Sequence, residues 1–287
     1  MLELFKRVLV ALIFVPLIVY IILIENPIFL FLFVLFLSIF AFFELKTILK
    51  RKGVTLPLWT SIFNVLIILG FYFSAKYSKN FLPYGIFIFS NFIFYVFKTF
   101  ESKFENSIKE ISIFTFTLFY TGFLIGHLIF FKFIKNGNYF LLYIIVLCWL
   151  NDTFAYFTGT LFGKKKLNLL VSPNKSYAGV IGGIFFSILG INFLLNFLFK
   201  KGIKFNLIFL KYNFKSEFIF SLKWNIIIGI IFGFIIIFSD LIESLLKRSA
   251  GIKDSSNLIP GHGGILDIFD SLIFTAPIFY YFVSLIL

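Results

Sequence analysis

Charged residues are scarce in this sequence, and acidic residues are the scarcest. Only 14% of the 287 residues are charged and 60% are hydrophobic, whereas about 25% of the residues in a soluble globular domain are charged. This shortage excludes an ordinary water-soluble fold. The single cysteine, Cys148, excludes an internal disulfide, and its place inside an apolar run is typical of a small packed side chain.

Uncharged apolar runs take up most of the chain. They approach or reach the about 17 to 25 residues that cross the hydrocarbon core of a bilayer. Helices are expected rather than a barrel, because the runs are apolar throughout and do not alternate with a period of two. We therefore predict an all-α polytopic integral membrane protein with about nine transmembrane helices. The predicted spans are 8–24, 26–43, 53–75, 80–97, 111–131, 136–151, 176–199, 224–239 and 271–287.

The first span follows Lys6 and Arg7, as the apolar part of a secretory signal peptide would. No small-residue cleavage pattern follows Ile24, so we expect this span to be retained. One membrane domain is expected, in two parts. Residues 1–135 hold about five N-terminal spans, and residues 136–287 hold about four spans of a C-terminal catalytic region.

The basic excess, a net charge of +13, is typical of proteins that bind nucleic acid or an anionic membrane surface. Here the cations flank apolar spans, so we expect membrane lipids and no nucleic acid as partners. If nine spans alternate, 16 of the 26 Lys and Arg residues lie on the side of the N-terminus. The positive-inside rule then places the N-terminus and the loops 163–175 and 244–270 in the cytoplasm and the C-terminus outside. We expect the membrane to be the bacterial cytoplasmic membrane.

Two small-xxx-small patterns occur in neighbouring apolar spans. Gly179 and Gly183 lie in one span, and Gly229 and Gly233 lie in the next. Such spacing allows helix backbones to approach closely in lipid. We expect each of these spans to pack tightly against a neighbouring helix.

The acidic residues cluster near the C-terminus: of 13 in the chain, five fall between positions 240 and 270, namely Asp240, Glu243, Asp254, Asp267 and Asp270. Asp240 ends an apolar run, where a carboxylate costs about 2.5 to 3.5 kcal/mol on insertion scales, so it needs a partner or a metal. If the helix continues, Asp240, Glu243, Ser244 and Lys247 share one face. That face could hold a cation and a phosphate, or Asp240 and Lys247 could simply neutralise each other.

A glycine turn, Pro260 to Gly264, follows this face and breaks any helix. Its amides could converge on an anion, or it could be an ordinary tight turn. Lys247, Arg248 and Lys253 before it supply cations, and Asp267 and Asp270 after it supply oxygen ligands of the kind that Mg²⁺ prefers. This combination at a membrane surface favours phosphoryl or nucleotidyl transfer. A zinc site fits poorly, because His127, His262 and Cys148 lie on separate segments.

A second polar group begins with Asp152 at the end of the span 136–151. It continues with Lys164, Lys165 and Lys166, which could serve a polyphosphate or only flank the span. The stretch around Gly159 and Gly163 is not a P-loop, because three residues separate the glycines where four are needed.

These residues resemble a known family, the phosphatidate cytidylyltransferases. The C-terminal signature of that family is matched by Ser244, Lys247, Arg248, Lys253, Asp254, Ser256, Ile259, Pro260, His262, Gly263, Gly264, Asp267 and Asp270. Its upstream elements are matched by Asp152, Ala155, Tyr156, Ser172, Pro173, Lys175 and Ser176. The resemblance covers roughly the C-terminal half. Three positions depart from the family pattern: Ile268 stands where arginine is usual, Ala178 where glutamate is usual, and Thr160 where arginine is frequent.

The resemblance implies that CTP and phosphatidate give CDP-diacylglycerol and pyrophosphate at a polar active site on the cytoplasmic side. It implies catalytic roles for Asp240, Ser244, Lys247, Asp267 and Asp270. Substrate and phosphate binding would fall to Asp152, Lys175, Ser176, Arg248, Lys253, His262, Gly263 and Gly264. Asp240 and Asp267 would lead, and Asp254 and Asp270 would support, the binding of one or two Mg²⁺ ions, optionally with a monovalent cation. A homodimer is compatible with the sequence.

Two other functions fit parts of the pattern. A CTP-dependent polyprenol or phytol kinase would share the membrane placement and the nucleotide chemistry. A secondary transporter would also place carboxylates in membrane spans. Against a transporter, the acids gather at one predicted cytoplasmic end and show no paired pattern across two halves of the chain.

Overall fold

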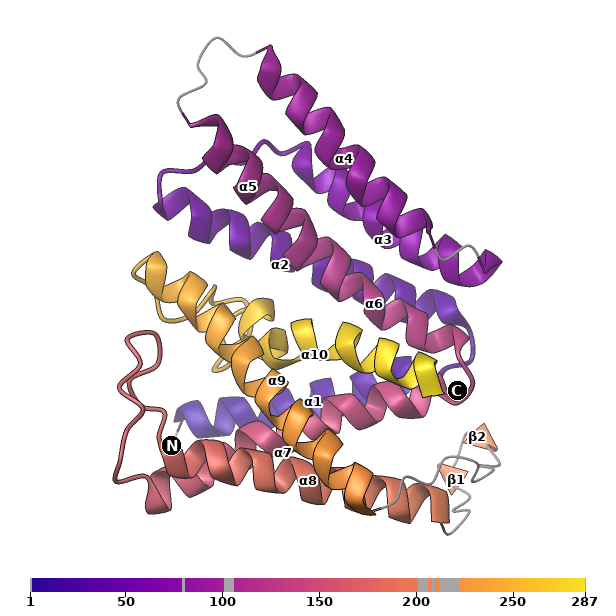
Figure 1. The fold of residues 1–287 in the computed structure, drawn as a ribbon, viewed down its shortest axis with the longest axis vertical. Coiled ribbons are helices and arrows are strands. Elements are labelled where there is room, and N and C mark those ends of the chain that lie inside the picture. Colours follow the sequence, from indigo (N-terminus) through magenta and orange to yellow (C-terminus); the bar gives the residue numbers. More distant parts are fainter. Residues whose placement is uncertain are drawn as a thin grey trace. The chain divides into compact units, whose positions relative to one another are not determined.

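The structure is a computed structural model that describes residues 2–78, 81–100, 106–200, 206–207, 210–211 and 222–286, and Figure 1 traces its elements. The described residues are helical except for loops and one short antiparallel pair, β1 (Asn206–Leu207) with β2 (Leu210–Lys211). The N-terminal helices are α1 (Leu2–Leu23), α2 (Pro27–Arg51), α3 (Thr60–Tyr77), α4 (Leu82–Thr99), α5 (Ser107–Thr117) and α6 (Ile125–Phe130). The later helices are α7 (Gly137–Phe162), α8 (Tyr177–Lys200), α9 (Leu222–Ser249) and α10 (Ile265–Ile286).

The predicted polytopic membrane fold is confirmed. Within the described residues, seven helical stretches are long and apolar enough to cross a membrane, and two shorter apolar helical segments, Val10–Leu23 and Tyr177–Asn192, coincide with the other two predicted spans. One long stretch, Ser107–Phe133, joins α5 and α6 through a π-helix, Leu118–Leu124. Helices dominate because in lipid every backbone N–H and C=O must find its partner within the segment.

Several helices continue past the apolar runs that predict them. The predicted span 136–151 extends to Phe162 in α7, and the predicted span 224–239 extends to Ser249 in α9. In α10 the helix starts at Ile265, six residues before the predicted span 271–287. Hydropathy marks the part of a helix that fits the hydrocarbon core, whereas polar residues continue the same helix into the interface. The motif residues therefore lie on helices as well as on loops.

The helices form two compact units. Unit 1 comprises Met1–Leu141 together with Leu246–Leu287, and unit 2 comprises Leu142–Leu245. Helices α7 and α9 each begin in one unit and end in the other. The division into 1–135 and 136–287 expected from the sequence stays a prediction, but packing groups the C-terminal segment with the N-terminal helices.

In unit 1, α3 packs against α2, α4 and α6, and α10 packs against α2 and α6. A buried polar network ties α2 and α3 to the π-helix. The Asn64 amide donates to the Ser38 hydroxyl at 2.7 Å, and the Thr121 hydroxyl donates to Asn64 Oδ1 at 3.0 Å. A Cβ at Gly122 would lie 2.5 Å from Asn64 Oδ1, so a side chain here would require the Asn64 amide to move. The network lies inside unit 1, and its hydrogen bonds join α2, α3 and the π-helix.

Unit 2 is held by close approaches of α8 to α7 and α9. A Cβ at Gly179 would lie 2.8 Å from the carbonyl oxygen of Ala155 on α7. On α9, a Cβ at Gly229 would lie 2.6 Å from Ile188 Cα, and one at Gly233 would lie 3.1 Å from Ile184 Cα. The tight packing predicted from the two small-xxx-small patterns is confirmed.

Candidate active site

The polar face predicted around Asp240 exists, because α9 continues without a break to Ser249. Asp240, Glu243, Ser244 and Lys247 follow one another at the spacing that puts them on one side of the helix. Carboxylate oxygens of Asp240 and Glu243 lie within 4.8 Å of each other. Glu243 and Lys247 are buried, whereas Asp240 and Ser244 are half-buried. This face therefore offers two oxygen-rich side chains at adjacent helix turns.

Asp240 has a cationic partner from the loop between α7 and α8. Lys175 Nζ lies 2.6 Å from Asp240 Oδ2, and the same Nζ is 3.5 Å from the carbonyl oxygen of Ile237. The sequence left open a neutralising pair between Asp240 and Lys247, but Asp240 pairs with Lys175 instead. The structure thus brings the upstream motif and α9 together within unit 2.

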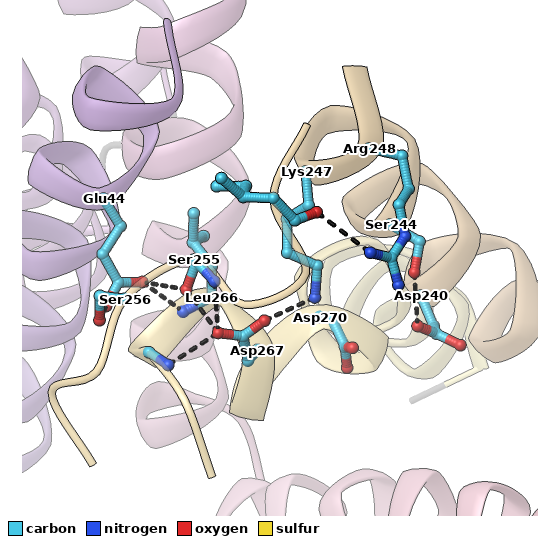
Figure 2. Close-up of polar contacts among 12 residues, drawn as sticks. Glu44, Asp240, Ser244, Lys247, Arg248, Ser255, Ser256, Leu266, Asp267 and Asp270 are labelled. Atoms are coloured by element: carbon cyan, nitrogen blue, oxygen red, sulfur yellow. Dashed lines mark hydrogen bonds and ion pairs between the residues drawn. The ribbon is translucent and has the colours of Figure 1, made fainter. Parts of the chain in front are cut away.

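Lys247 has a different partner, Asp267 on α10, and both belong to unit 1 (Figure 2). Lys247 Nζ lies 2.5 Å from Asp267 Oδ1, and the two side chains are only 11% and 8% exposed. Oδ2 of Asp267 accepts hydrogen bonds from the Ser255 amide, the Ser255 hydroxyl and the Gly264 amide, at 2.7 to 2.8 Å. A charge this deeply buried needs such pairing and hydrogen bonding. Asp267 thereby joins α9, the loop 250–264 and α10.

The glycine turn is closed by its own backbone. The Gly263 amide donates to the carbonyl oxygen of Ile259, and the Ile259 amide donates back to Gly263 at 2.8 Å. Gly261 and Gly263 have φ of 80° and 88°, a region that glycine enters without strain. The amides of residues 262 to 264 all donate within the chain. Binding of a phosphate by these particular amides stays a prediction that would require those bonds to open.

Glu44 is a part of this region that sequence reasoning missed. It lies on α2, is 6% exposed, and accepts hydrogen bonds from the amides of Ile265 and Leu266 at the start of α10. Figure 2 shows it beside Leu266. The Ser256 hydroxyl also donates to it, and the Ser255 hydroxyl shares its single proton between Glu44 and Asp267. A signal was present, because Glu44 follows an apolar run just as Asp240 does, and a carboxylate at that depth needs partners.

Three further predicted site residues are exposed or make hydrogen bonds of their own within their units. Asp152 is exposed on α7. The Ser176 hydroxyl is buried and accepts the Gly179 amide as the N-cap of α8. Asp270 Oδ1 accepts the amide and hydroxyl of Ser271. Their roles in binding substrate or metal stay predictions.

The remaining cations of the motif face solvent. Arg248 is exposed and donates to the carbonyl oxygen of Ile252 at 3.2 Å. Lys253 and Asp254 are exposed on the loop that follows. The exposed cations Arg248 and Lys253 can reach an anionic ligand without breaking an ion pair of the core.

Nδ1 of His262 is buried and has no hydrogen-bond partner among the described residues.

The apolar helices define an integral membrane protein, and each of its two units holds a lysine–carboxylate pair. The chain belongs to the cytidylyltransferase family, which it matches over residues 5–286.

Three similar proteins are named phosphatidate cytidylyltransferase. That of Haemophilus influenzae is 39% identical over 155 residues, 53% of this chain and 48% of that protein. That of Staphylococcus aureus strain COL is 36% identical over 160 residues, 54% of this chain and 52% of that protein. The matched stretch thus spans about half the length of these two relatives. That of Staphylococcus saprophyticus is 32% identical over 252 residues, 85% of this chain and 86% of that protein.

Proposed function

We propose that this protein transfers the cytidylyl group of CTP to phosphatidate, giving CDP-diacylglycerol and pyrophosphate. The observation that supports it most is the buried ion pair of Lys247 with Asp267, whose carboxylate also accepts the amide of Ser255 from the loop 250–264. This pair ties the end of α9, the loop 250–264 and the start of α10 to one another, and these segments hold most of the residues that match the family signature. The names of the relatives supply the substrates.

In the proposed reaction an oxygen of the lipid phosphate attacks the α-phosphorus of CTP. A new phosphoanhydride bond forms, the bond from the α-phosphorus to the bridging oxygen breaks, and pyrophosphate leaves with that oxygen. The nucleophile is already an anion, so no strong general base is needed and His262 is not assigned that role. Positioning and neutralisation of charge by Lys175, Arg248 and Lys253 are expected to dominate.

A divalent cation such as Mg²⁺ would neutralise charge on the phosphates when bound. The donor chemistry fits, because the candidates are carboxylates, which Mg²⁺ prefers. Asp240 is our first candidate ligand, supported by the nearby carboxylate of Glu243. Asp254, Asp267 and Asp270 remain candidates, although Oδ2 of Asp267 already accepts hydrogen bonds from three donors within the protein.

We also propose an orientation in a bacterial cytoplasmic membrane, with the N-terminus and the loops 163–175 and 244–270 in the cytoplasm. The cation bias and the exposed lysines 164, 165 and 166 support it. There the lipid headgroup from the bilayer and the soluble nucleotide could meet. A homodimer stays a prediction.

The test is the fate of the phosphates of CTP. Purified protein with Mg²⁺ and phosphatidate should move label from the α-phosphate into the lipid and release label from the γ-phosphate as pyrophosphate. A lipid kinase would instead move the γ-label into the lipid and leave the α-label in CDP. Entry of γ-label into lipid, or no labelled lipid under any condition, would overturn the proposal.

A further inference from the structure

The start of α10 has an unusual N-cap. The residue before the helix, Gly264, has no side chain with which to accept the first free amides, a role usually filled by Ser, Thr, Asp or Asn. Glu44, from a helix more than 200 residues earlier, takes that role. Its carboxylate accepts the Ile265 amide at 2.9 Å and the Leu266 amide at 2.8 Å, over sequence separations of 221 and 222.

The glycine is required by this arrangement. A Cβ at Gly264 would overlap the Ser255 hydroxyl and the Glu44 carboxylate, so a side chain here would displace the remote cap. The third helical residue, Asp267, completes the cap by accepting the Gly264 amide. This is the return bond of a capping box, in which the residue at the third helical position binds back to the cap. Glu44 and Asp267 therefore share the free amides of one helix end.

Ser255 connects the two carboxylates. Its hydroxyl lies 3.0 Å from Glu44 Oε2 and 2.7 Å from Asp267 Oδ2, and Figure 2 shows it between them. The Ser256 hydroxyl adds a contact to Glu44 Oε1 at 2.7 Å. A buried carboxylate at a helix N-terminus is favoured by the helix dipole and by its donors, two amides and the Ser256 hydroxyl, with the Ser255 proton shared between it and Asp267. Glu44 thus holds both the loop 250–264 and the first turn of α10.

We propose that Glu44 is a positioning residue for cytidylyl transfer. By fixing the first turn of α10 it fixes Asp267, and through Asp267 the buried ammonium group of Lys247. Glu44 touches no reacting group itself. This inference rests on the proposed function for its effect on rate, but the anchoring of the helix end can be measured without any activity.

The experiment compares Glu44→Gln and Glu44→Asp with wild-type protein in detergent. Gln keeps the shape of the side chain but turns an amide N–H₂ toward amides and hydroxyls that themselves donate. Hydrogen exchange of residues 255–267 should accelerate about tenfold or more, as expected for loss of a hydrogen-bonded buried charge. For Glu44→Gln the kcat should fall about tenfold or more while the KM for CTP stays within about twofold. Glu44→Asp keeps the charge but shortens the side chain, so its exchange rate and its kcat should lie between those of the wild type and those of Glu44→Gln.

Asn64→Ala is the matched control, because it breaks buried hydrogen bonds of the same unit in which no motif residue takes part. It should lower the melting temperature and leave the exchange of residues 255–267 and the kcat close to wild type. The inference is wrong if Glu44→Gln leaves exchange and kcat unchanged, or if Asn64→Ala lowers kcat as much. Should the wild type make no CDP-lipid, the proposed function fails, while the exchange comparison still decides whether Glu44 anchors α10.

Discussion

Two lysines of the motif each have an acidic partner, and in both cases the partner comes from another element. Lys175 on a loop pairs with Asp240 on α9, and Lys247 on α9 pairs with Asp267 on α10. The second pair is more deeply buried, so removing one member leaves a charge in a low-dielectric surrounding, a loss that costs about 3 to 5 kcal/mol. The first pair is half-buried and can exchange partners more easily when an anion or a cation binds.

Asp240→Asn tests the assignment of Asp240 as a cation ligand. It removes a negative oxygen beside Lys175, so kcat should fall by more than the roughly 10 to 100-fold that loss of an outer-shell partner costs a metal site. The Mg²⁺ concentration for half-maximal rate should rise, and a chelator should abolish activity until Mg²⁺ is restored. Lys175→Met keeps the ligand oxygen and should instead raise the KM for CTP. The control is Glu110→Gln, whose partner is Lys98, and an unchanged Mg²⁺ titration of Asp240→Asn would refute the assignment.

At the scale of helices, the sequence predicts which helices occur better than it predicts where each helix begins and ends. Apolar runs locate the membrane spans because lipid selects for them, and the small-xxx-small patterns predict the contacts of Gly179, Gly229 and Gly233. Helix ends and caps were missed because they depend on partners far away in sequence. No local sequence pattern predicts that Glu44 caps α10 or that backbone amides surround Asp267. The spacing of Asp240 and Lys247 predicts a shared face but not that each binds a different neighbour.

Gly229→Ala tests the close packing of α9 on α8. Its new methyl group would lie 2.6 Å from Ile188 Cα, a backbone atom that can move only with its helix. We expect a destabilisation of about 1 to 3 kcal/mol, as for overpacked cores, seen as a lower melting temperature in detergent. Gly85→Ala on α4 is the matched control, since nothing lies within 4 Å of its Cβ position. It should be neutral or stabilising by up to about 1 kcal/mol, and equal melting temperatures for the two variants would contradict the packing.

At the scale of the whole molecule, the family and the helices account for an integral membrane protein, and the charge bias gives the proposed orientation. The only cysteine, Cys148, is buried, so Cys148→Ala provides a background for single-cysteine labelling. In intact cells, a membrane-impermeant maleimide should label Lys135→Cys, and it should label Lys166→Cys only after permeabilisation. Both lysines are exposed. The reverse pattern would place the motif on the outer side and remove the meeting point proposed for CTP and lipid.

We propose that the segment 244–270 carries cytidylyl transfer. Asp267 is its key residue, because it contacts α9, the loop 250–264 and the start of α10. The most direct measurement is the rate at which label from the α-phosphate of CTP enters lipid in purified wild type and in Asp267→Ala. We predict a loss of at least about a hundredfold in the variant, because Lys247, Ser255 and the Gly264 amide all lose a common partner. A variant that transfers the label as fast as the wild type would contradict the account.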